Sequence, residues 1–68
     1  MSQDYCVTKV TSGRGGRLIY GRPVRFKQRD TAIEFARDAW KNLKAEGEAK
    51  GTRFVLTQGA VLVREYKV

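Results

Sequence analysis

Histidine is absent from the sequence, and cysteine, proline, methionine and tryptophan each occur once. A single cysteine, Cys6, excludes an internal disulfide framework and a metal site built from several cysteines. It stands between Tyr5 and Val7 in a run typical of a strand, so we interpret it as a small buried hydrophobic residue. Without histidine or converging carboxylates, the chain offers no recognisable acid–base pair or metal-ligand cluster. We therefore expect a protein that is not an enzyme and that uses no metal or cofactor.

Long apolar runs are also absent. None approaches the ~18 residues that a membrane-spanning helix needs. The first residues, M-S-Q-D-Y, lack the basic and apolar regions of a signal peptide. We expect a cytoplasmic protein that does not bind a membrane.

The chain length of 68 residues leaves room for one small domain, 1–68. A domain of this size buries only ~60 % of the surface that its unfolded chain exposes. Since a shared interface adds buried area, a homodimer is one expected assembly.

Acidic residues are missing from residues 9–29, which we call the basic segment. Its sequence is K-V-T-S-G-R-G-G-R-L-I-Y-G-R-P-V-R-F-K-Q-R, and its bases are Lys9, Arg14, Arg17, Arg22, Arg25, Lys27 and Arg29. These seven charges equal the net charge of the whole chain, +7. A chain that needed charge only for solubility would mix the signs over its surface. The concentration of one sign indicates a surface for an anionic partner.

The basic segment has the pattern of a β-hairpin. Residues 4–11 are rich in β-branched and aromatic types and predict a strand, and the glycines of 12–16 predict the turn. A second strand is expected over 17–27, interrupted at Gly21-Arg22-Pro23, where glycine beside proline indicates an edge position or a bulge. A bulge would shift the alternation of side chains between the two faces, so the face on which Arg22 lies stays open. Simple alternation places Leu18, Tyr20, Val24 and Phe26 on one face and Arg17, Ile19, Arg25 and Lys27 on the other. We therefore assign Tyr20 and Phe26 to the core rather than to base stacking.

A helix is expected next. Thr31 and Glu34 match a capping box, with Asp30 as a competing N-cap, and Gly47 suits the position after the helix end. Helical spacing gathers one broad apolar sector: Ala32, Ile33, Phe35, Ala36, Ala39, Trp40 and Leu43. Trp40 is accordingly predicted to be a core residue.

The last third predicts a second hairpin, 52–57 and 60–68, turning at Gln58-Gly59. The expected fold is α+β, with the order ββαββ and one helix packed on one face of a four-stranded antiparallel sheet. Because Val55, Leu56, Val61, Leu62 and Val63 put apolar groups on both faces of this hairpin, the face without a helix is a candidate dimer interface. Tyr5 and Tyr66 have no clear assignment and could lie on that face.

Two short segments resemble known patterns. The run S-G-R-G-G-R resembles a phosphate-binding glycine loop, but it lacks G-x-x-x-x-G-K-[ST] and is interpreted as a tight turn that carries arginines. The strand pair followed by T-A-I-E-F-A-R-D-A-W is similar in style to small α+β proteins of bacteria and their phages, a similarity that carries no functional residues across.

The function expected from these features is non-enzymatic nucleic-acid binding with low sequence specificity, in which the bases of the basic segment contact phosphates. Arg53, Arg64 and Lys67 are candidates to extend this surface. The alternative is a protein-interaction module, a phage- or bacterial-type regulator or inhibitor, that docks on an acidic partner protein and uses the same arginines for steering. The sequence does not distinguish DNA from RNA, or single strands from double strands, as the ligand.

Overall fold

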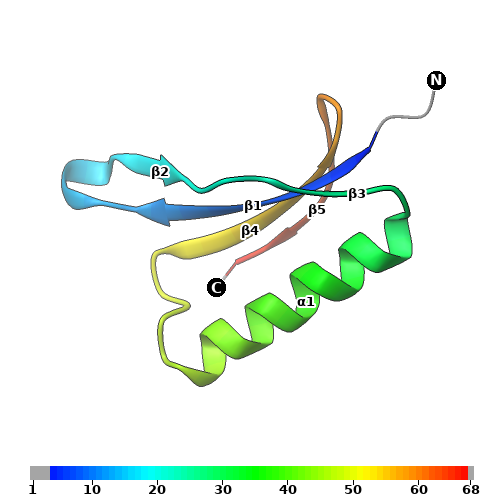
Figure 1. The fold of residues 1–68 in the computed structure, drawn as a ribbon. Helices are drawn as coiled ribbons and strands as arrows, with labels where there is room; N and C mark the ends of the chain where they lie inside the picture. Colours follow the sequence, from blue (N-terminus) through cyan, green and yellow to red (C-terminus); the bar gives the residue numbers. More distant parts are fainter. Residues whose placement is uncertain (1–3, 68) are drawn as a thin grey trace.

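The main chain of residues 4–67, the part that this computed structural model describes, forms one α-helix and a five-strand antiparallel sheet (Figure 1). The strands are β1 (Tyr5–Ser12), β2 (Leu18–Tyr20), β3 (Val24–Phe26), β4 (Thr52–Gln58) and β5 (Val61–Tyr66). The helix α1 (Arg29–Ala45) lies between β3 and β4 in the sequence, and a short 3-10 turn, η1 (Arg14–Gly16), precedes β2. Within residues 4–67, no helix is long and apolar enough to cross a membrane.

The sheet has the order β2-β1-β4-β5, and β3 also pairs with β1. Because β4 occupies one side of β1 along its length, β2 and β3 share the other side. The predicted α+β arrangement, with one helix on an antiparallel sheet, is confirmed. The predicted number of four strands is not, because the second arm of the first hairpin is broken into β2 and β3 at residues 21–23.

This break is a bulge of one residue. Val10 pairs with Tyr20, and Val7 pairs with Val24, so three steps along β1 match four steps along its neighbour. The Gly21 N–H donates to the carbonyl oxygen of Lys9 at 2.7 Å. A Cβ at position 21 would lie 3.2 Å from that oxygen, so the close approach of the two backbones favours glycine.

Because of the bulge, the residues before it and after it do not follow one simple alternation between the two faces of the sheet. Directly opposite residues share a face of the sheet, so Val24 lies on the face of buried Val7, whereas Tyr20 lies with Val10 on the other face. Phe26 packs against the core, with its ring 5.1 Å from that of Phe35. The prediction that Phe26 belongs to the core is confirmed, and the same prediction for Tyr20 is wrong.

The helix begins earlier than predicted. Its first backbone bond runs from the Ala32 N–H to the Gln28 carbonyl, and Gln28 is the N-cap, without a capping bond from its side chain. The predicted capping box from Thr31 is therefore wrong, because Thr31 already lies in the first turn. The other end agrees with the prediction: the Gly47 N–H bonds to the Lys44 carbonyl, and the Glu48 N–H bonds to the Leu43 carbonyl.

The core lies between α1 and the strands β1 and β4. Ala32, Ala36, Trp40 and Leu43 are buried on the helix, as its apolar spacing predicts, and they pack against residues that include Val7, Phe54 and Leu56. Trp40 meets Phe54 edge to face, with ring centroids 6.3 Å apart. Tyr5 and Tyr66 pack against this same core, which settles their assignment.

The last hairpin turns at Gly59 and Ala60, one residue later than predicted, and Val68 lies outside the described residues. Leu56 and Val63 contact the core, whereas Val61 and Leu62 on the outer strand β5 are 64 % and 55 % exposed. By register, Leu62 lies opposite Thr57 on the face without a helix, whereas Val61 lies opposite Gln58 on the other face. The homodimer stays a prediction.

Replacing Trp40 by alanine should lower the free energy of unfolding by about 3–5 kcal/mol, because it removes a buried aromatic ring from the core. Urea denaturation followed by circular dichroism measures this. Leu62→Ala, which truncates an exposed side chain, is the control and should change stability by less than about 0.5 kcal/mol. A Trp40→Ala protein that unfolds like the Leu62→Ala control would contradict this description of the core.

The hydroxyl of Tyr66 is buried and has no hydrogen-bond partner among residues 4–67. A buried polar group without a partner is destabilising, so Tyr66→Phe should raise the free energy of unfolding by about 1 kcal/mol. Tyr20→Phe removes an exposed hydroxyl instead and should leave the same measurement unchanged. A decrease in stability of Tyr66→Phe would show that this hydroxyl makes a favourable bond.

Candidate anion-binding surface

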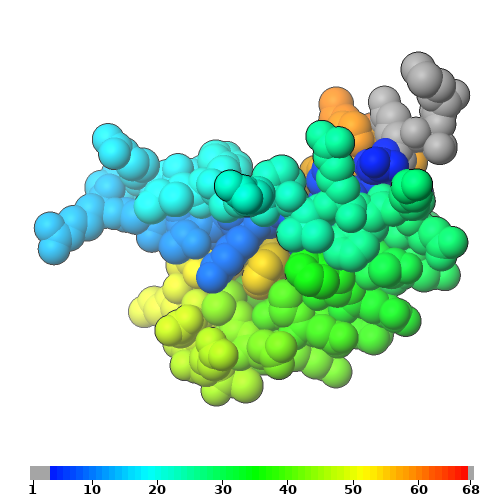
Figure 2. Space-filling model, viewed as in Figure 1, coloured from blue at the N-terminus to red at the C-terminus, as the bar shows by residue number. Residues whose placement is uncertain are grey.

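The bases of the basic segment follow one long edge of the molecule. They start on β1 at Lys9, pass through the hairpin tip at Arg14 and along the β2/β3 edge, and end at Arg29, the first residue of α1. Figure 1 shows this path from the hairpin tip, which extends beyond the helix, to the start of α1 at the other end of the sheet. In the space-filling view the same stretch, coloured blue to green, forms a continuous band above the helix (Figure 2). The molecule measures 39 × 25 × 17 Å, so the band follows an elongated body.

All seven bases are exposed, and none has an acidic partner among the described residues. Within residues 4–67, the ion pairs within 4.0 Å are Arg37–Asp38, Arg53–Glu65 and Lys67–Glu65. The side chains predicted to form the site are therefore exposed, with no ion pair to an acid within residues 4–67. Register places Lys9, opposite Phe54, on the face of α1 and Arg25, opposite Cys6, on the other face of the sheet. An edge strand with unpaired charges is protected from pairing with other sheets, and it is also available to an anion.

The glycine-rich segment at the tip is the tight turn predicted for it. Gly15 and Gly16 have positive φ values of 72° and 79°. The Gly13 N–H donates to the Arg17 carbonyl at 2.6 Å, so the backbone closes on itself. Arg14 is exposed at this tip, as expected.

The face of the sheet opposite α1, which we call the open face, carries part of the site. Register places on it the alternate residues of β1 and β4 that do not contact the core: Cys6, Thr8, Val10, Arg53, Val55 and Thr57. Arg25 stands opposite Cys6, and Tyr20 stands opposite Val10. Tyr20 is 67 % exposed, whereas Val10 beside it is only 5 % exposed. Tyr20 was not among the residues predicted for the site, and the signal that could have identified it is the glycine and proline at 21 and 23.

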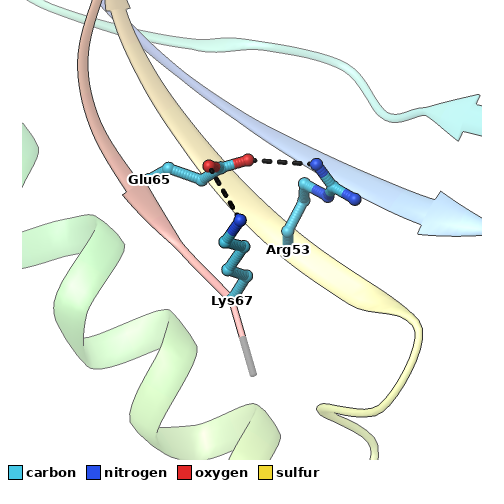
Figure 3. A network of polar contacts seen from close by, with 3 residues as sticks. All are labelled: Arg53, Glu65 and Lys67. Atoms are coloured by element: carbon cyan, nitrogen blue, oxygen red, sulfur yellow. Dashed lines mark hydrogen bonds and ion pairs between the residues drawn. The ribbon is translucent and has the colours of Figure 1, made fainter.

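A charged cluster lies on the open face between β4 and β5. The Glu65 carboxylate accepts a hydrogen bond from the Arg53 guanidinium at 3.1 Å and lies 3.9 Å from the Lys67 ammonium (Figure 3). One acid thus partners two bases, and the cluster keeps one positive charge. Of the three bases expected to extend the surface, Arg53 and Lys67 are in this cluster, and Arg64 is exposed on β5.

A shallow pocket of about 120 Å³ adjoins the cluster. Its lining comes from the end of β1, the loop before β4 and the cluster itself: Ser12, Ala49, Gly51, Thr52, Arg53 and Lys67. Two hydroxyl groups and two cationic groups border this pocket, which is the donor chemistry that suits a phosphate oxygen.

Comparison of the chain with protein-family models, with curated proteins and with solved structures found no match. The function is therefore inferred from the surface just described.

Proposed function

We propose that this protein binds nucleic acid with little sequence specificity, and that the bases of the basic segment contact the phosphate backbone. The observation that carries this proposal is the run of seven exposed bases from β1 through the hairpin tip and the β2/β3 arm to the start of α1, with no acidic partner for any of them among residues 4–67. Lysine and arginine side chains that neutralise phosphates release counterions, which drives binding without regard to sequence.

The shape of the charged surface favours an extended polyanion over a small anion. The bases run along a molecule 39 Å long instead of converging on one point. Five of the seven are arginines, whose planar guanidinium bonds to phosphate through two N–H groups and also stacks on bases. Both properties suit a nucleic-acid strand.

The helix supports low specificity. Reading a duplex sequence commonly requires a helix or β-ribbon whose side chains reach base edges in the major groove. The exposed side of α1 is mixed in charge, with Glu34 and Asp38 beside Arg37 and Lys41. Such a surface is poorly suited to enter a groove lined by phosphates, so the contacts are expected to be to the backbone.

The triple variant Arg14→Ala, Arg17→Ala, Arg25→Ala tests this proposal. It should weaken oligonucleotide binding and reduce the slope of log affinity against log salt by about one unit for each phosphate that is no longer neutralised. Fluorescence anisotropy at several salt concentrations measures both quantities. The matched control is Lys41→Ala, Lys44→Ala, Lys50→Ala, which removes the same charge from the helix and the following loop.

The comparison of these two variants decides between long-range attraction and direct binding at the edge. Equal decreases in affinity for both would show that only net charge matters and would contradict the assignment of the edge. An acidic partner protein is favoured instead if polyglutamate binds the wild-type chain as tightly as an oligonucleotide of equal charge.

Glu65→Gln tests whether the cluster extends the surface. Removing the carboxylate leaves Arg53 and Lys67 without their shared acid, so affinity for an oligonucleotide should rise and the salt slope should steepen by up to about one unit. Glu34→Gln makes the same charge change on the exposed side of α1 and should have a smaller effect. If the two variants behave alike, Arg53 and Lys67 lie outside the binding surface.

A further inference from the structure

The open face carries an exposed aromatic ring among basic groups. Tyr20 reaches this face only because of the bulge at 21–23, and most of its surface is exposed to solvent. The other two tyrosines, Tyr5 and Tyr66, pack against the core. Tyr20 is therefore the tyrosine available to a ligand on this face.

The neighbours of Tyr20 form a row across the sheet. Val10 lies directly opposite it on β1, and Arg53 lies opposite Val10 on β4. Neighbouring strands are about 4.8 Å apart, so Arg53 is about 10 Å from Tyr20 across the sheet. Buried Val10 between them gives the row an apolar floor.

The positive charge of the open face suits the phosphate backbone of a nucleic-acid strand. Arg25, Arg53 and Lys67 lie on or beside it, and the acidic residues that face it are Glu65, which is held by two bases, and Asp4 at the far end near Arg25. The pocket bordered by Ser12 and Thr52 adjoins Arg53, at the end of the same row. A phosphate there would lie within reach of hydroxyl and cationic donors.

We infer that the open face binds an unpaired segment of nucleic acid, with a base stacked on Tyr20 and a neighbouring phosphate held beside Arg53 and Lys67. This inference rests on the proposed function and adds the form of its ligand. Bases in a duplex are stacked on one another and cannot lie on a side chain, whereas the bases of a single strand can. The lysine and arginine side chains of the basic segment then contact the flanking phosphates.

The experiment compares affinities for oligothymidylate and oligouridylate with those for a duplex of the same length. Tyr20→Ala should weaken single-strand binding roughly tenfold, the effect of removing one base–aromatic stack, and should change duplex affinity less than about twofold. Tyr20→Phe keeps the ring and should bind like wild type. Val61→Ala truncates a similarly exposed side chain on β5 and is the matched control.

A second readout reports on the ring itself. In a Tyr20→Trp variant, single-strand binding should quench the fluorescence of the new indole, after subtraction of the signal of Trp40 measured in the wild-type chain. The duplex should leave that fluorescence unchanged. Position 20 is exposed, so we expect its substitutions to leave the fold intact and both readouts to report on binding.

The outcomes separate this inference from the function on which it rests. If Tyr20→Ala binds single strands like wild type, or if its affinities for single strands and duplex fall equally, the stacking role is wrong, while the proposed function stands as long as the arginine triple variant is weakened. If the wild-type chain binds neither ligand at low salt, both are wrong.

Discussion

The single extra residue between β2 and β3 is the constraint on which the rest of the surface depends. The hydrogen bond from the Gly21 N–H to the Lys9 carbonyl keeps the second arm of the hairpin next to β1 at the point where this arm contains one residue more than β1. On one side of this point Val24 and Phe26 lie on the face of α1, where Phe26 packs against the core and Val24 is exposed. On the other side of this point Tyr20 lies on the open face, so the two halves of this arm contribute side chains to opposite faces of the sheet.

The second constraint is that one helix covers one face of a sheet. α1 buries Ala32, Ala36, Trp40 and Leu43 in one core with residues of β1, β4 and the loop before β4, and Trp40 contacts Phe54 of β4. This arrangement leaves the opposite face without a layer. Two threonines, two valines, Cys6 and the Arg53–Glu65–Lys67 cluster occupy it, so the face combines small apolar side chains with hydroxyl and charged groups that suit a polar ligand.

Features set by local sequence were predictable. The turn glycines, the apolar sector of the helix, its end before Gly47 and the order of the elements, apart from the division of the second strand into β2 and β3, all follow from residues close together in the chain. Features set by register were not. The glycine and proline at 21 and 23 indicate a bulge, but only the pairing with β1 shows that it adds one residue and moves Tyr20 out of the core. Likewise, the partners of Glu65 follow from the alignment of β4 with β5, which no short segment contains. The helix start was misplaced because Thr31 and Glu34 form a plausible capping box inside a helix that begins earlier.

We propose that the β2/β3 edge and the open face together contact a nucleic-acid strand. The most direct measurement is a titration of the isotope-labelled protein with a single-stranded oligonucleotide, followed by the backbone amide resonances. We expect chemical-shift changes along residues 9–29 and at Arg53 and its neighbours on β4, with little change on the exposed side of α1. Changes centred on Glu34, Arg37 and Lys41 of the helix, or no changes at low salt, would contradict it.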